Sequence, residues 1–169
     1  MTSTNTWKEF NKNTLTHSGA HYLMAIHELH EEQGYARLSD IAKQLRISKG
    51  SLSTSLKPLI KKRLIQEDSN KHLSLSVSGK ILAKNIENTC ATIQHFLNIF
   101  GVHKTTASID ACKIEHLLSS ESSNMILKLV KALKENPKLV KDIQREMQKH
   151  DKCSIKGCMV CKSNKFCLA

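Results

Sequence analysis

Apolar side chains recur every three or four residues along most of the chain, a spacing that predicts a mainly α-helical fold. The first firm helix is expected over residues 18–33, and Gly34 is its stop signal. Its apolar face consists of Tyr22, Leu23, Ile26 and Leu29. The segment before it, residues 7–17, is polar and rich in Asn and Thr, so this helix is the first element that the pattern predicts.

Two further helices follow in a helix-turn-helix pattern. The first is short, over residues 38–45, and Ser39 is its expected cap. The second begins at the cap Ser48 and runs to about residue 62, with an apolar face made of Leu52, Leu56, Leu59 and Ile60. Pro58 removes one hydrogen bond from this second helix, so we expect it to kink the helix or to mark an irregular end.

A wing of two short strands is predicted next, because residues 64–68 and 72–78 flank a polar turn and the second run alternates apolar and polar positions. The helix before the wing exposes small hydroxyl side chains, which can reach base edges and phosphates in a major groove without bulk. The residues expected to contact DNA are Ser48, Lys49, Ser51, Ser53, Thr54, Ser55, Lys57, Lys61 and Lys71. The alternative interpretation is a solvated helix that happens to be basic.

The second half of the chain predicts three amphipathic helices, over residues 79–101, 108–119 and 122–136. Such helices after a winged helix usually form a dimer core. A dimer also suits DNA binding, because two symmetric recognition helices can read half-sites about one helical turn apart.

Charge supports a polyanionic partner, since the 169 residues carry a formal net charge of +11. A solvated, soluble surface is the alternative explanation. No apolar run approaches the roughly 20 residues that cross a bilayer, and no leader pattern opens the chain, so we expect a cytoplasmic protein. We find no nucleophile and base pair, phosphate loop or nucleotide fingerprint, and we therefore expect no enzyme.

Two cysteine-bearing segments carry candidate metal chemistry. In the first, Cys112, Glu115 and His116 are spaced i, i+3 and i+4, so on one helix they would share a face and could bind one cation. The second is the tail with Cys153, Cys158, Cys161 and Cys167. Four cysteines in fifteen residues fit a [4Fe-4S] cluster, which the uneven spacing favours, or a structural Zn²⁺ site, or free and redox-active thiols.

Residues 20–133 resemble the family of the diphtheria toxin repressor and the manganese transport regulator. The resemblance rests on Tyr22-Leu23-x2-Ile26-x-Glu28-Leu29, on Ser48 through Leu56, on Ser76-x-Ser78-Gly79-x2-Leu82-Ala83 and most strongly on Ala111-Cys112-x2-Glu115-His116. It implies a winged helix-turn-helix, a homodimer and metal-dependent binding to double-stranded operator DNA. The metal ligands that it implies are His21, Met24, Cys90, Cys112, Glu115 and His116.

The chain departs from that family in ways that affect the metal. Cys90 stands near the position where the family generally has histidine, and Gln94 near a position where a carboxylate is common. Thiolates with imidazole favour Fe(II), Zn(II), Co(II) or Ni(II) over Mn(II), and Fe(II) is our first choice with Zn(II) as the alternative. Cys90 could instead be a small core residue, and His21 could pair with His17 on the surface.

The sequence therefore predicts a mainly α fold with three parts: a winged helix-turn-helix DNA-binding domain over 1–78, a helical metal-binding and dimerisation domain over 79–136, and a helix plus cysteine-rich tail over 137–169. The predicted function is a homodimeric, metal-dependent transcriptional repressor in iron homeostasis, with the tail site as a second input. Two alternatives stay open, a winged-helix adaptor that binds proteins and a redox Fe–S protein without sequence-specific DNA binding.

Overall fold

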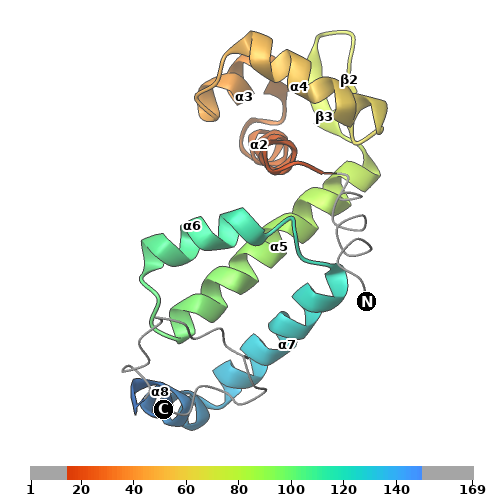
Figure 1. The fold of residues 1–169 in the computed structure, drawn as a ribbon. Helices are drawn as coiled ribbons and strands as arrows, with labels where there is room; N and C mark the ends of the chain where they lie inside the picture. The colour runs from red at the N-terminus through yellow and green to blue at the C-terminus, as the bar shows by residue number, and fades with distance from the viewer. Residues whose placement is uncertain (1–14, 150–169) are drawn as a thin grey trace, which may run out of the picture.

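The computed structural model describes residues 15–149, which form a winged helix-turn-helix above a second group of helices (Figure 1). The elements are α2 (His17–Gln33), β1 (Ala36–Arg37), α3 (Leu38–Gln44), α4 (Lys49–Lys61), β2 (Ile65–Glu67), β3 (His72–Leu75), α5 (Val77–Ile99), α6 (Lys104–Ile114), α7 (Ser120–Glu135) and α8 (Pro137–Lys149). The four-cysteine tail lies outside the described residues. Within residues 15–149, no helix has the length and apolar content needed to span a bilayer.

The predicted first helix is confirmed, and both of its ends have a local cause. Thr16 caps α2, because its hydroxyl accepts a hydrogen bond from the Gly19 N–H at 3.1 Å. At the other end Gly34 has a φ of 80°, a left-handed conformation that glycine adopts without steric cost.

The helix-turn-helix is also confirmed, although one predicted cap is wrong. Ser39 lies inside α3, and its hydroxyl donates to Asp40 rather than accepting from the helix backbone. The N-cap lies two residues earlier, at Arg37, because that residue is already held in extended conformation by pairing with His72. Ser48 caps α4 as predicted, accepting from the Ser51 N–H at 3.1 Å. Pro58 does not end α4, which continues to Lys61.

The wing is confirmed as the antiparallel pair β2 and β3, in which Ile65 lies opposite Leu75. The sequence did not predict β1, which completes a three-stranded sheet in the order β1-β3-β2 and pairs Ala36 with Leu73. A strand of two residues is too short to show alternation, so pairing with β3 rather than local pattern defines it.

The core of the winged helix joins α2, α3, α4 and the sheet. Its largest fully buried side chains are Leu23, Ile26, Ile41, Leu52, Leu56 and Ile65. Each such side chain contributes about 1.5–3 kcal/mol relative to an exposed position. This packing orients α4, so the face opposite its buried leucines is presented outward.

The long helix α5 connects the two layers and packs against α2, α6 and α7 (Figure 1). It begins at Val77 rather than at residue 79, because the Ser76 hydroxyl accepts from the Gly79 N–H at 3.0 Å and caps it. The predicted helix over 108–119 is displaced, since α6 covers Lys104–Ile114 and starts from a His103 cap. The predicted helix over 122–136 is α7, capped by Ser119.

Gly79 fixes the junction between wing and α5, which gives a first prediction. A Cβ at this buried position would overlap the backbone carbonyl of Leu64. We expect Gly79→Ala to lower the free energy of unfolding by about 1–3 kcal/mol, the usual effect of overpacking. Urea unfolding followed by circular dichroism measures this change.

The matched control is Gly50→Ala, because a Cβ at Gly50 meets no atom within 4 Å. This variant should unfold at the same urea concentration as the wild type or at a slightly higher one, since alanine favours helix over glycine by about 0.5–1 kcal/mol. Equal stability of the two variants would contradict the account of the junction.

Candidate metal centre between α2 and α6

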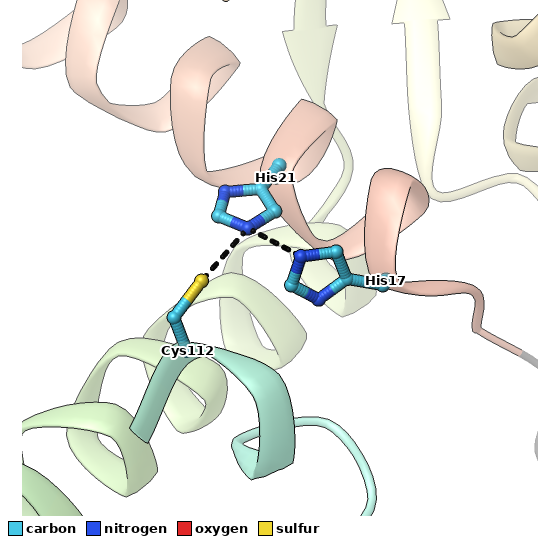
Figure 2. A group of neighbouring side chains, drawn as sticks. All are labelled: His17, His21 and Cys112. Atoms are coloured by element: carbon cyan, nitrogen blue, oxygen red, sulfur yellow. Dashed lines mark hydrogen bonds between the residues drawn. The ribbon is translucent and has the colours of Figure 1, made fainter. Parts of the chain in front are cut away.

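Three potential ligand atoms meet where α2 passes over α6. The Nε2 atom of His21 lies 3.2 Å from the Cys112 Sγ and 3.2 Å from the His17 Nε2. All three ligand atoms lie within 4.8 Å of one another, and Figure 2 shows the His21 ring linked both to the Cys112 sulfur and to the His17 ring. Two imidazoles and one thiol are donors that divalent transition metals bind.

Both helices hold these side chains from rigid positions. His17 and His21 stand one turn apart on α2, whose opposite face is anchored in the core by Leu23 and Ile26. Cys112 follows directly after Ala111, which is fully buried. Since neither helix can rotate without disturbing its packed face, the three donors are preorganised.

Glu115 adds a buried negative group beside this cluster. Its side chain is 3% exposed, and neither carboxylate oxygen has a hydrogen bond of ordinary geometry to another described residue. The Cys90 thiol lies near enough to interact with it, but a thiol is a weak donor. A buried carboxylate without hydrogen bonds is costly unless a positive charge offsets it, so this residue fits a cation site.

Electrostatic interactions connect the remaining candidates to the same place. The imidazole of His116 has its centroid 5.1 Å from that of His17. Burial lowers the pKa of His116. The neighbouring His17 and His21 lower this pKa further, and Glu115 raises it. A neutral imidazole is the form that binds metals.

The two described cysteines differ in their surroundings. Burial, followed by the neighbouring Glu115, raises the pKa of Cys90 to about 12, so this thiol keeps its proton at neutral pH. The pKa of Cys112 is also raised, by burial and then by Glu115. Cys112 is the thiol that faces the two histidines, whereas Cys90 reaches the site from α5 on the side of Glu115.

The structure brings together most of the residues that the sequence singled out. Cys112 lies against His21 of α2, the His116 ring lies 5.1 Å from that of His17, and Glu115 is buried near Cys90. The three therefore lie around one junction. Met24 lies one turn beyond His21 and lines a cavity of 630 Å³ between α2 and α5.

His17 is the member of the cluster that sequence reasoning treated only as a surface partner of His21. The available signal was the i, i+4 spacing of the two histidines on one predicted helix, which is a common metal-ligand spacing. The proximity of His17 to Cys112 depends on where α6 packs relative to α2, and local sequence patterns do not predict that packing.

The predicted DNA-contacting residues lie on α4 and on the wing. Eight are exposed, at positions 48, 49, 51, 53, 54, 57, 61 and 71, whereas Ser55 is half-buried toward the core. The Ser48 hydroxyl accepts a hydrogen bond from the Ser51 N–H. Lys71 forms an ion pair with Glu67, with 3.0 Å between Nζ and Oε1. The remaining exposed side chains are distributed along α4.

Comparisons with known proteins agree with this organisation. Residues 14–73 match the family described as "Iron dependent repressor, N-terminal DNA binding domain", and residues 76–143 match "Iron dependent repressor, metal binding and dimerisation domain". The junction of these two matches falls at Ser76, the cap of α5. The candidate centre therefore joins a helix of the first domain to helices of the second.

Relatives and solved structures cover most of the described chain. The HTH-type transcriptional regulator MntR of Lysinibacillus sphaericus is 30% identical over 130 residues, covering 77% of this chain and 94% of that protein. MntR of Bacillus subtilis is 32% identical over 133 residues, with the same shares of both chains. The manganese regulator SloR shares the fold with a TM-score of 0.60 at 24% identity, covering 66% of this chain and 53% of that one.

The IdeR structure from T. acidophilum gives a TM-score of 0.55 at 24% identity over 64% of this chain and 52% of that one. The two adjoining domain matches, together with MntR relatives that are matched over 94% of their length, identify the family of the chain. It belongs to the iron-dependent repressor family, and it is a dimerising, metal-dependent transcriptional regulator that binds double-stranded DNA.

Proposed function

We propose that this protein is a repressor whose DNA binding is switched on by Fe(II) or Zn(II) held between α2 and α6. The observation that carries the proposal is the contact of His21 with Cys112 at 3.2 Å. His21 belongs to the segment that matches a DNA-binding domain and Cys112 to the segment that matches a metal-binding and dimerisation domain. An ion bound by both side chains connects the two domains.

The donor set supports a metal softer than manganese. SloR is a manganese regulator by name, whereas this site offers two imidazoles and a thiol within 4.8 Å and a buried carboxylate nearby. Thiol ligands favour Fe(II), Co(II), Ni(II) and Zn(II), and Mn(II) prefers oxygen. Fe(II) is our first candidate and Zn(II) the second, in keeping with a role in iron homeostasis.

We assign His17, His21 and Cys112 as the direct ligands, with Glu115 and His116 completing the site. A bound divalent cation would offset the negative charge of the buried Glu115 carboxylate. The Cys112 thiol must release its proton to become a ligand, so binding is coupled to proton loss. Cys90, with its pKa near 12, is assigned as a protonated thiol that packs against Glu115.

The same contacts explain why metal would change DNA affinity. When α2 is fixed to α6, the winged helix is fixed relative to the dimer core, and so is the distance between the two recognition helices of a homodimer. DNA with correctly spaced half-sites selects that arrangement, and metal and DNA then raise each other's affinity.

The tail with Cys153, Cys158, Cys161 and Cys167 is proposed as a second metal site, a [4Fe-4S] cluster with Zn(II) as the alternative. The four residues lie outside the described part, and their spacing is the support for this assignment. The site would report iron supply or oxygen to the regulator, in a protein that we expect to be cytoplasmic.

The thiol ligand gives a direct prediction. In a background with the four tail cysteines changed to serine, Co(II) should produce a thiolate charge-transfer band in the near ultraviolet. Cys112→Ser should remove the band and weaken binding by at least about 100-fold, because a serine hydroxyl is a poor ligand. Absorption titration with Co(II) measures both quantities.

His27→Ala is the control, since His27 lies on the same helix but lines the α2–α5 cavity instead of facing Cys112. It should leave both the band and the affinity unchanged. A band that survives Cys112→Ser and disappears in Cys90→Ser would show that the assignment of the two thiols is reversed.

Lysines on α4 give a prediction for DNA binding. Changing Lys57 and Lys61 together to glutamine should make the slope of log affinity against log salt concentration shallower for any duplex. The change is about 1 for each phosphate that is no longer neutralised, so up to about 4 for the four lysines of a dimer. Binding measured by fluorescence anisotropy over a range of salt concentrations tests this. The exposed Lys138 on α8 serves as control, and Lys138→Gln should not alter the slope. Equal slopes for all three proteins would place the DNA on another face.

Iron, zinc and acid-labile sulfide per chain, measured on protein purified without oxygen, test the tail. About four iron and four sulfide atoms per chain, which disappear when the four tail cysteines are serine, are expected for a [4Fe-4S] cluster. Zinc without sulfide would support the structural alternative, and absence of both would remove the second input from the proposal.

A further inference from the structure

Gly50 is a glycine that the fold does not explain. It lies in the first turn of α4, is exposed, and does not have the positive φ that Gly34 and Gly101 have. A Cβ at this position would meet nothing within 4 Å among residues 15–149. Since glycine in a helix is less stable than alanine, neither backbone geometry nor packing within the protein accounts for it.

Thr54 stands one turn after Gly50, and its hydroxyl is bonded to the backbone of the same helix. Its Oγ1 donates a hydrogen bond to the Gly50 carbonyl oxygen at 3.1 Å, and the residue is exposed. With the hydroxyl turned back to the helix backbone, the γ-methyl is the group that Thr54 presents outward. Thr54 therefore presents an apolar group within an otherwise polar and basic helix face.

Helical geometry places both residues opposite the core. At 100° per residue, positions 50 and 54 fall within about 30° of the direction opposite to the buried Leu52, Leu56 and Leu59. Lys57 and Lys61 project on the same side and can reach phosphates. The bare backbone at Gly50 and the methyl of Thr54 thus lie at the point where α4 would come closest to a base pair.

We propose that Gly50 and Thr54 form the contact for the 5-methyl group of a thymine in the major groove. This methyl is the apolar group that the major groove displays, and a threonine methyl is a known kind of partner for it. The missing side chain at Gly50 lets the helix approach, and the Thr54 methyl packs on the thymine. The inference rests on the proposed DNA-reading role of α4 and specifies what one position of the operator must be.

The test uses the full chain loaded with Zn(II) and a duplex selected from a random library by binding to it. Each thymine of that duplex is then replaced in turn by deoxyuridine, which removes only the methyl group. At one thymine per half-site, wild-type affinity should fall about fourfold for each contact, the effect of one buried methyl, or about 15-fold for both half-sites.

Two variants of Thr54 separate the methyl from the hydroxyl. Thr54→Val keeps the methyl group and should stay sensitive to that deoxyuridine. Thr54→Ser keeps the hydroxyl, should bind the thymine duplex about 15-fold more weakly in the dimer, and should show no further fall in affinity with deoxyuridine. Gly50→Ala should fold normally and bind the same duplex at least about tenfold more weakly, because its Cβ blocks the approach.

The outcomes distinguish this inference from the proposed function beneath it. If a duplex is selected but the deoxyuridine effect is the same in wild type and Thr54→Ser at every position, the thymine contact is wrong while DNA reading by the protein stands. Undiminished affinity of Gly50→Ala would also overturn the contact. If Zn(II)-loaded protein enriches no sequence, both the inference and the proposed operator recognition fail.

Discussion

The proposed coupling of metal and DNA binding depends on one contact between polar side chains of separate helices, that of His21 on α2 with Cys112 on α6. Around this contact lie His17, His116 and a carboxylate, Glu115, that is buried without an ordinary hydrogen bond among the described residues. Buried groups of this kind destabilise a protein unless they are paired or bound to a cation. The fold nevertheless positions them on well-packed helices, which indicates a site built for an ion rather than for stability alone.

The rest of the architecture converts that local event into a change in DNA recognition. The core of the winged helix holds α2 rigidly against α4, so the orientation of α2 is also the orientation of the recognition helix. At the other end, Ser76 and Gly79 join the wing to α5 with little room for adjustment, since Gly79 lies against the Leu64 carbonyl. The packing of α2 on α5 adds to this junction, and an ion bound at His21 and Cys112, as proposed, would add a further attachment between the two domains.

Much of this fold could be predicted from the sequence, because local signals define it. Thr16 and Gly34 mark the two ends of α2, and Ser48 marks the start of α4. The alternation in β3 and the apolar stripe of α5 are also visible within short segments. Where the prediction failed at α3 and β1, long-range contacts decided the outcome. Pairing with His72 moved the start of α3 away from Ser39, and the two-residue strand β1 exists only beside β3.

The candidate site shows the same division between local and long-range information. The spacing of Cys112, Glu115 and His116 identified the right segment, whereas the position of His17 beside Cys112 depends on how α2 crosses α6. The tail cysteines remain a sequence-based prediction.

The central claim is that one ion between α2 and α6 and one operator select the same arrangement of the dimer. The most direct measurement is the affinity of the protein for Co(II), by absorption titration, with and without its selected duplex. The account predicts tighter Co(II) binding on DNA, by the same factor by which Co(II) tightens DNA binding, because such coupling is reciprocal. An affinity for Co(II) that the duplex leaves unchanged would contradict it.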